Sequence, residues 1–423
     1  MNYRTDKQFA IEQDRDDPLA EYRHRFHLPQ TVGTEPDIYL CGNSLGLQPK
    51  TATAWVEQEL ADWAKLGVKG HLEARHPWLP YHERVTDKLA DIVGAKPDEV
   101  VAMNTLSVNL HLMMVSFYRP TQSRYKILIE RGAFPSDRYA VESQLRFHGF
   151  DPKDALLLVG NDDGTIELDD IEAIISRNAA SLALILLPGV QYLSGQCLPM
   201  AKIARLGHEV DAQVGLDLAH AAGNVPLALH DWDVDFAVWC HYKYMNSGPG
   251  AVGGCFVHNR HADGKLPRFA GWWGHDKKSR FEMGDEFHPI PGAEGWQLSN
   301  PPILSLAPLA ASLELFAAAG MPALRKKSIR LTGYLEYLLG ETLGGRIGIT
   351  TPADPDARGC QLSLRLALTR EAARDTFEKI GAAGVTCDWR EPNIVRVAPA
   401  PLYNHYQDVF EFVEILKKAV DDE

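Results

Sequence analysis

The stretch GLDLAH at residues 215–220, with WCHYKY at residues 239–244 after it, decides the fold of this chain. The mostly apolar run before Asp217 is typical of a buried strand, so the carboxylate lies at a strand's C-terminal end, where open α/β sheets bind ligands. Lys243 follows a second strand-like run, residues 234–239. A carboxylate there can pair with a protonated pyridine nitrogen, and a lysine in an apolar pocket can form a Schiff base with an aldehyde. The order of acid, histidine and lysine therefore indicates a pyridoxal phosphate (PLP) enzyme that holds its cofactor at both ends.

Taken one at a time, these residues have ordinary structural explanations. An aspartate after a strand is often a helix N-cap, and His220 would then lie on the same side of the first helical turn. A single lysine such as Lys243 is usually a solvated surface residue. Only the combination of the three residues in this order favours a cofactor site.

Composition sets the broad class of the protein. The chain has 423 residues, of which 45% are hydrophobic and 23% charged, enough to form one large and one smaller domain. Its formal net charge of −13 argues against a nucleic-acid or anionic-membrane surface, because neither would be attracted overall. A small molecule is therefore the expected partner.

Cysteine usage and the N-terminal segment indicate the compartment. The six cysteines are far apart and form no CxxC pair, which is typical of reduced thiols in a cytosolic protein without disulfides (Cys41, Cys197, Cys240, Cys255, Cys360 and Cys387). Residues 1–25 are rich in charge and lack an apolar core, and no later stretch approaches the length of a membrane span. We expect a soluble, cytoplasmic protein.

Strand-like and helix-like segments alternate through the first three quarters of the chain. Helical spacing is found at residues 51–66, 168–176 and 200–210, and a helix begins near Ser107. Strands are predicted at residues 100–103, 126–130, 155–159, 182–187, 214–216, 234–239 and 253–257. This order predicts an α/β fold with a mainly parallel seven-stranded sheet covered on both faces.

A change of pattern near residue 310 predicts the domain division. A run rich in Ala and Leu begins at Leu306 and continues to about Leu343, with a break near Gly320. Strands at residues 360–366 and 394–397 follow, so the C-terminal part is predicted to be a separate α+β unit. We expect an N-terminal segment at residues 1–50 that contributes to the small domain and the active site. A large PLP-binding domain at residues 51–310 and a small domain at residues 311–423 complete the division.

Two further patterns are set aside. The sequence GPGAVG at residues 248–253 matches a dinucleotide-binding pattern but precedes a strand, so its glycines are assigned to tight turning after Lys243. No histidine cluster has metal-ligand spacing, and His24 with His27 and His258 with His261 are predicted to be surface pairs.

Glycine and proline accumulate at residues 284–302, which predicts a long loop of the kind that often carries function.

A phosphate site is predicted at NTLS, residues 104–107, between a strand and a helix. Free backbone N–H groups and the helix dipole there would face an anion, although Ser107 is equally explained as an N-cap. The segment AFPSD at residues 133–137 follows the next strand. It brings Phe134, which can stack on a pyridine ring or belong to the core, and Asp137 beside it.

Across nearly its full length the chain resembles the kynureninase family, PLP enzymes of the aspartate-aminotransferase fold (fold type I) and the class V aminotransferase group. The motifs that carry the resemblance are YLCGNSLGL (39–47), NTLSVNLHL (104–112), FPSD (134–137), DLAHA (217–221), YKY (242–244), GWWGH (271–275), SNPP (299–302) and RVAP (396–399). The resemblance implies cleavage of L-kynurenine, or its 3-hydroxy derivative, by water to anthranilate, or 3-hydroxyanthranilate, and L-alanine, a step of tryptophan breakdown.

The resemblance also assigns residues. It implies that Lys243 is the Schiff-base lysine and that Asp217 pairs with the pyridine nitrogen. Tyr242 is then a candidate proton donor or a phosphate ligand. The remaining matches are cofactor positions at Leu106, Ser107, Phe134, Asp137, His220, Tyr242, Trp272 and Asn300, a substrate-carboxylate clamp at Arg396, and ring-facing positions at His71 and Asn300. A homodimer is implied, with Trp272 and Asn300 reaching the site of the neighbouring subunit.

Two positions depart from the animal members of the family, and two other functions stay open. Ser107 replaces a threonine and keeps the hydroxyl, whereas Pro188 replaces a serine and leaves one polar contact in question. A cysteine desulfurase or an aminotransferase would share Asp217, His220 and Lys243, but a desulfurase needs a reactive cysteine on a loop, and Cys360 is predicted to be core. A non-catalytic PLP-binding protein is the other alternative, although the chain has no basic patch or added DNA-binding domain.

Overall fold

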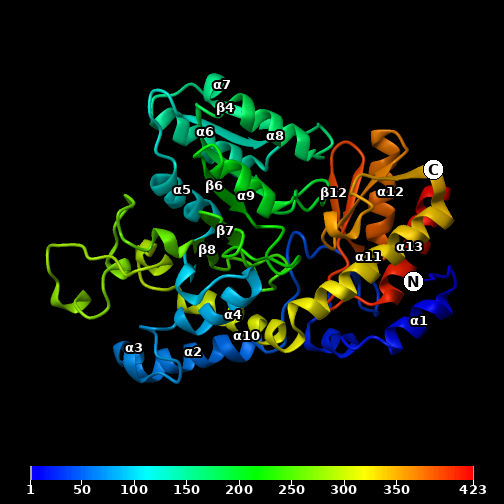
Figure 1. Cartoon of the computed structure of the whole chain (residues 1–423). Helices are drawn as coiled ribbons and strands as arrows, with labels where there is room; N and C mark the ends of the chain where they lie inside the picture. The colour runs from blue at the N-terminus through cyan, green and yellow to red at the C-terminus, as the bar shows by residue number, and fades with distance from the viewer. Residues whose placement is uncertain (1, 423) are drawn as a thin grey trace.

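A seven-stranded sheet forms the centre of the larger part of the molecule (Figure 1). The computed structural model describes residues 2–422. Strand β8 runs antiparallel to both neighbours, and every other neighbouring pair is parallel, so the mainly parallel sheet is confirmed. In spatial order the strands are β2 (Val100–Ala102), β8 (Gly253–Val257), β7 (Phe236–Cys240), β6 (Gln213–Asp217), β5 (Leu182–Pro188), β3 (Lys126–Glu130) and β4 (Leu156–Val159).

Helices cover both faces of this sheet. All residues of β5, β7 and β8 are buried, which explains their continuous apolar sequence. Alternate strand residues enter two separate cores, because successive side chains point to opposite faces. The helices of the larger part are α2 (Ala52–Leu66), α3 (Gly70–Glu73), α4 (Glu83–Val93), α5 (Leu106–Phe117), α6 (Pro135–Phe147), α7 (Pro152–Ala155), α8 (Leu168–Arg177), α9 (Met200–His208) and α10 (Ile303–Ala319).

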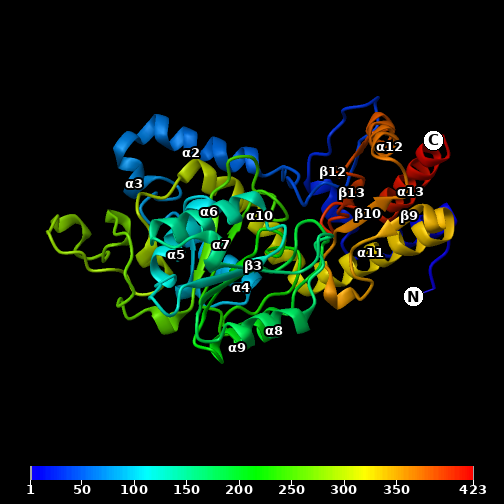
Figure 2. The same ribbon diagram turned by 90° about the horizontal axis from the view of Figure 1, so that it is seen from above.

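The smaller part contains a four-stranded antiparallel sheet with its own core. Its strands are β12 (Asp388–Arg390), β13 (Ile394–Val397), β10 (Leu362–Leu366) and β9 (Ile347–Ile349), in spatial order. The N-terminal segment joins this part, since β1 (Ile38–Tyr39) pairs with β11 (Val385–Thr386). Both chain ends lie on this side of the molecule (Figures 1 and 2), where the helices are α1 (Lys7–Arg15), α11 (Met321–Leu343), α12 (Arg370–Ala382) and α13 (Tyr406–Asp421).

The chain turns sharply between α10 and α11 at Gly320, which has a positive φ of 75°. The apolar side chains of α10 belong to the core of the larger part, whereas those of α11 from Leu331 onward belong to the core of the smaller part. The predicted domain limits stay a prediction, and these contacts favour a boundary at Gly320. Within residues 2–422 no single helix is long and apolar enough to cross a membrane, and α10 and α11 would qualify only as a pair bent by 81°.

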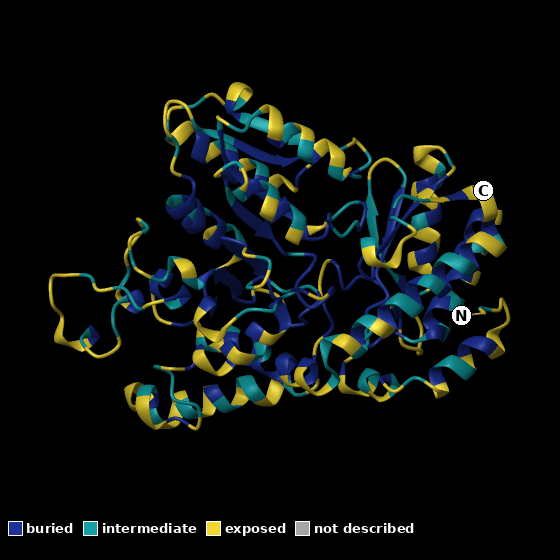
Figure 3. Ribbon diagram, in the orientation of Figure 1, coloured by how far each residue is buried: buried dark blue, intermediate teal, exposed yellow. Residues whose placement is uncertain are grey.

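A long segment, residues 259–302, separates β8 from α10 and extends from the body of the molecule (Figures 1 and 2). This projecting loop begins earlier than the predicted loop at residues 284–302. It contains four short 3₁₀ helices, η4 (Asn259–His261), η5 (Trp272–Gly274), η6 (Arg280–Glu282) and η7 (Ala293–Trp296). Much of its outer part is exposed (Figure 3), including the large apolar side chains of Phe269, Trp272, Phe281 and Met283.

Candidate active site

One pocket lies where the parallel strands β3, β5 and β6 end, beside the first turns of α5 and α6. Open α/β sheets bind ligands at this edge. The cavity volume of the pocket is about 80 Å³. It brings together most of the predicted cofactor residues, namely Leu106, Ser107, Phe134, Asp137, Asp217, His220, Tyr242 and Lys243.

Lys243 lies on the turn that follows β7, and its Nζ is 3.0 Å from Nε2 of His220. The same Nζ lies 5.9 Å from the ring centre of Phe134. Burial, and then the positive charge of Lys243, lower the pKa of His220 well below its usual value. The imidazole is therefore neutral and can accept a hydrogen bond from the lysine.

An N-terminal segment, residues 38–46, supports the turn that carries Lys243. The amide of Gly46 donates to the carbonyl of Tyr242 at 2.8 Å, and a Cβ on Gly46 would overlap the carbonyl oxygen of Lys243. Only glycine allows this approach. Farther up the segment, the amide of Leu40 donates to the Thr386 carbonyl, and its carbonyl accepts from the Ala398 amide, both at 2.8 Å. The segment thus connects the Lys243 turn to the smaller part of the molecule.

Three carboxyl groups line the pocket: Asp217, Asp137 and Glu130. Asp217 ends β6, and its Oδ1 accepts a hydrogen bond from the Ala219 amide at 2.6 Å. The chain then continues in turns, so Asp217 is not the cap of a helix. Burial, and then the charge of Asp217, raise the pKa of Asp137 well above its usual value, and burial raises the pKa of Glu130 to about 8. Both shifts keep these two groups protonated at neutral pH.

The N-terminus of α5 forms another wall of the pocket. Thr105 is the N-cap residue and makes no side-chain cap hydrogen bond, so Ser107 lies inside the first turn and is not the cap. The first amide N–H groups of a helix have no acceptor within the helix and favour anions. Gly253 of β8 lies close to this turn, where a Cβ would be only 3.1 Å from the Leu106 amide nitrogen. The turn is therefore held tightly against the sheet, with Leu106 and Ser107 facing the pocket.

Two further residues discussed in the sequence analysis, Tyr242 and Pro188, also line the pocket. Burial, and then the neighbouring Cys240, raise the pKa of the Tyr242 hydroxyl, which keeps its proton. Pro188 ends β5 opposite Asp217 and offers neither a hydroxyl nor an amide N–H to a ligand. The polar contact that a serine would supply at this position is therefore missing from this side chain.

Arg396 lies in β13 of the smaller sheet and is only 1% exposed. Its Nη1 donates to the carbonyl oxygen of Tyr192 at 2.6 Å, and Asp388 binds its other side. Tyr192 itself lines the pocket, with its ring edge-on to that of Phe134 at 5.4 Å between centres. Through Tyr192 the guanidinium of Arg396 is held beside the pocket.

The sequence reasoning missed two pocket residues, Tyr192 and Glu130. Glu130 follows the rule that identified Asp217, since it ends β3, whereas Tyr192 lies four residues beyond the end of β5. A search of every predicted strand end would have found Glu130. Tyr192 had no comparable signal, because its place depends on contacts with Phe134 and Arg396 from other elements.

Besides Arg396, three predicted residues lie outside this pocket in the same chain. His71 lies in α3, where its ring contacts Trp78 edge-on at 5.5 Å. Trp272 lies in the projecting loop and donates from Nε1 to the Arg280 carbonyl at 3.0 Å. Asn300 lines a separate cavity near Thr105, on the loop that leads into α10. A single chain therefore does not bring these three residues to Lys243.

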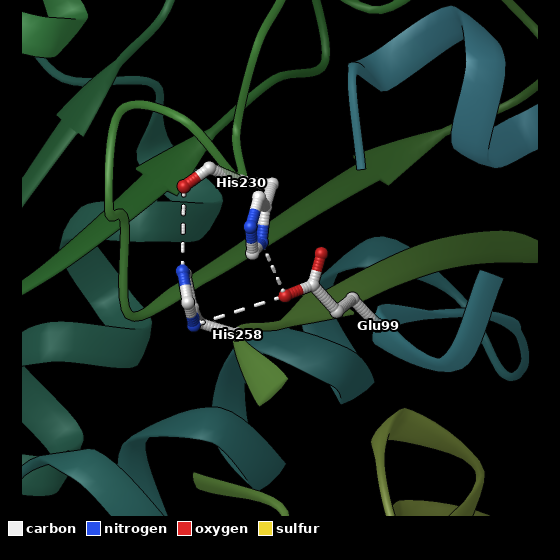
Figure 4. Close-up of side chains that lie close together, drawn as sticks. All are labelled: Glu99, His230 and His258. Atoms are coloured by element: carbon white, nitrogen blue, oxygen red, sulfur yellow. Dashed lines mark hydrogen bonds and ion pairs between the residues drawn. The ribbon is translucent and has the colours of Figure 1, made fainter. Parts of the chain in front are cut away.

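The prediction that His258 is a surface residue was wrong. His258 is buried, and its ring stacks on that of His230 at 4.8 Å, beside the fully buried Glu99 (Figure 4). Nδ1 of His230 lies 2.8 Å from Oε1 of Glu99, and the Asn259 amide donates to the same oxygen at 2.9 Å. Nδ1 of His258 accepts a hydrogen bond from the Arg260 amide. The side-chain nitrogen and oxygen atoms that could bind a metal ion therefore already take part in hydrogen bonds within the protein.

Cys360 is fully buried, as predicted, and burial raises its pKa to about 12. All six cysteines are free. A protonated thiol without access to solvent cannot serve as the reactive cysteine on a loop that a desulfurase needs.

The comparisons with known sequences cover almost the whole chain. A model of the kynureninase C-terminal domain matches residues 324–416. A curated kynureninase of Koribacter versatilis is 55% identical over 97% of this chain and 97% of its own length. Those of Myxococcus xanthus (57%, 97% of this chain and 96% of the relative) and Xanthomonas campestris (59%, 95% of each) are similarly close.

Solved structures of lower sequence identity share the fold. A cysteine desulfurase of Thermococcus onnurineus superimposes with a TM-score of 0.72 at 17% identity, covering 97% of this chain and 98% of that one. The cysteine desulfurase CsdA of Escherichia coli gives 0.76 at 16%, covering 95% and 98%. A variant of the enzyme C-DES, with glycine covalently linked to its PLP cofactor, gives 0.76 at 16%, covering 93% and 98%. The chain has the fold type I architecture of these proteins.

Proposed function

The chain belongs to the kynureninase family, and we propose that it is a PLP-dependent hydrolase that cleaves L-kynurenine or its 3-hydroxy derivative. The products are anthranilate or 3-hydroxyanthranilate, together with L-alanine. The observation that carries the proposal is the pocket in which Lys243, His220, Asp217 and the first turn of α5 converge. No described cysteine supports the desulfurase alternative, and the identity to kynureninases extends over both parts of the chain.

The pocket fits PLP in its chemistry. The exposed amides at the start of α5 suit a phosphate group, and the carboxylate of Asp217 suits a protonated pyridine nitrogen. The Phe134 ring is partly exposed toward Lys243 and can cover a flat heterocycle. We propose that Leu106, Ser107, Phe134, Asp137, His220 and Tyr242 bind the cofactor between these two ends.

Bound PLP supplies an aldehyde that bonds to amines and a ring that takes up electrons. Lys243 lines the pocket, and neutral His220 at 3.0 Å can accept a hydrogen bond from its Nζ, so we assign the α-proton transfer to Lys243. Asp217 would provide the negative charge that keeps the ring nitrogen of the cofactor protonated. The Tyr242 hydroxyl, whose raised pKa keeps it protonated, is suited to donate to a developing negative charge or to a phosphate oxygen.

Replacement of Arg396 with alanine tests the proposed substrate clamp. We expect KM for L-kynurenine to rise about a hundredfold, because a buried guanidinium that binds a carboxylate contributes strongly to binding. Affinity for PLP should change little, since Arg396 lies on the smaller sheet and not among the cofactor residues. Substrate and cofactor titrations of both proteins measure the two effects. A larger loss of PLP affinity than of substrate affinity would contradict the assignment.

A homodimer with shared sites is the second part of the proposal. Trp272 and Asn300 match cofactor positions of the family but lie outside the pocket of their own chain. The projecting loop that carries both also exposes Phe269, Phe281 and Met283, and such apolar patches are typical of interfaces. We propose that this loop contacts a second copy and brings Trp272 and Asn300 to its pocket. The mass of the protein in solution tests the assembly.

His71 is proposed to face the aromatic ring of the substrate. We expect His71→Ala to change the ratio of kcat/KM for 3-hydroxykynurenine and kynurenine by about tenfold, because a side chain that bonds a hydroxyl group discriminates its presence. Parallel steady-state assays with the two substrates measure the ratio. An unchanged ratio would rule out this role.

The function itself is tested by mixing PLP-loaded protein with L-kynurenine and with 3-hydroxy-L-kynurenine. Anthranilate fluorescence and alanine release should appear together in the first mixture. The rates of alanine release in the two mixtures rank the two substrates. A protein that binds PLP but forms neither product would keep the fold and cofactor and overturn the function.

A further inference from the structure

The β12–β13 pairing places one acidic side chain beside the proposed substrate clamp. In this antiparallel pair Asp388 lies directly opposite Arg396, at the distance where cross-strand side chains meet. Oδ1 of Asp388 is 3.1 Å from Nε of Arg396, and Oδ2 is 2.7 Å from Nη2. The carboxylate therefore binds one edge of the guanidinium through two parallel contacts, a geometry that fixes the plane of the group.

A third contact restricts the guanidinium further. Nη1 of Arg396 donates to the Tyr192 carbonyl at 2.6 Å. Arginine has N–H donors on all three nitrogens, so once these three contacts are made the remaining donors lie on Nη1 and Nη2. These are the two atoms with which arginine binds a carboxylate end-on. Tyr192 lines the pocket, and the guanidinium carbon of Arg396 lies 5.9 Å from the centre of its ring, so the guanidinium lies beside the pocket.

The charges of this cluster leave one positive charge to be balanced. Asp388 also lies 3.0 Å from Nε of Arg390, so a single carboxylate serves two arginines. The positive charges of Arg396 and Arg390 both act on the pocket, where they contribute to lowering the pKa of His220. A bound carboxylate would supply the missing negative charge.

We propose that Asp388 is a positioning residue, which holds Arg396 so that its free N–H donors meet the α-carboxylate of an amino-acid ligand. This inference rests on the proposed function, in which Arg396 binds that carboxylate. It assigns to the smaller sheet a second residue needed for substrate recognition, one that touches neither the substrate nor the cofactor.

The test compares two amines that differ in the carboxylate. PLP-loaded protein is titrated with L-alanine, the expected product, and with ethylamine, and binding is followed by the absorbance of the cofactor. Asp388→Asn, which keeps the size of the side chain, should weaken L-alanine binding about tenfold and leave ethylamine binding unchanged. The matched control is Glu391→Gln on the same hairpin, where an exposed pair with Arg370 is lost and neither affinity should change.

A second comparison separates positioning from a merely structural role. In an Arg396→Ala background, Asp388→Asn should produce no further loss of L-alanine affinity, because its effect acts through the guanidinium. An additional loss there, an equal loss for ethylamine, or unchanged L-alanine affinity in the single variant would each overturn the inference. If Arg396→Ala itself leaves L-alanine binding intact, the proposed clamp fails instead. Should Asp388→Asn not fold, Asp388→Glu, which keeps the charge but moves the carboxylate, serves in the same comparisons.

Discussion

Lys243→Ala is expected to lower turnover of L-kynurenine by at least about a thousandfold, because it removes the group that we propose both bonds the cofactor and acts as the base. The neighbouring His220 cannot replace it, since burial lowers the pKa of that imidazole and its Nε2 loses the hydrogen-bond partner 3.0 Å away. Reduction with borohydride should attach the cofactor covalently to the wild-type chain and not to the variant. Mass spectrometry of both proteins detects the added mass.

Lys202→Ala is the matched control for this variant. Lys202 is half-exposed and pairs with Glu172 at the surface, so its loss should alter neither turnover nor cofactor attachment. A Lys243→Ala protein that retained near-normal turnover would remove the basis of the proposed chemistry.

Asp217→Ala is expected to bind PLP weakly and to lower kcat by about a hundredfold to a thousandfold, the cost usual for losing a buried charge that stabilises a reacting group. Weak binding should remain because the first turn of α5 and Phe134 are unchanged. Steady-state assays at saturating PLP measure the loss, and the affinity is measured by titrating the apoprotein. Unchanged kinetics would mean that the partner of the pyridine nitrogen lies elsewhere.

The neighbouring acid offers a sharper form of this experiment. Asp137 is held protonated by burial and by the charge of Asp217. Loss of Asp217 removes the second cause, so Asp137 becomes easier to ionise and can take over part of the role. We expect the double variant Asp217→Ala/Asp137→Asn to lose more activity than the single one, whereas Asp137→Asn alone should have the smaller effect.

The elements that sequence could predict are those with a local signal. The strands at residues 126–130 and 253–257 and the helix break at Gly320 follow from apolar runs and a single glycine, and the structure confirms them. Asp217 and Lys243 were found for the same reason, since each follows a buried strand in the chain. The structure brings both to one pocket.

The residues that sequence could not predict depend on pairing between distant segments. Asp388 meets Arg396 only because β12 and β13 pair in one particular register. His258 was taken for a surface residue because its spacing to His261 says nothing about Glu99, which lies far away in the chain. Trp272 and Asn300 show the limit most clearly, since both lie outside the pocket of Lys243 in the same chain and no local pattern in the sequence indicates this.

The short segment at residues 38–46 sets a length scale for the ligand. Near one end Leu40 is hydrogen-bonded to Thr386 of β11 and to Ala398, two residues after Arg396. At the other end Gly46 is hydrogen-bonded to Tyr242, the residue before Lys243. One continuous piece of backbone therefore links the neighbourhoods of the proposed carboxylate-binding group, Arg396, and the proposed amine-binding group, Lys243. An α-amino acid carries its carboxylate and its amine a fixed distance apart, and the length of this segment helps to fix the matching distance between the two protein groups.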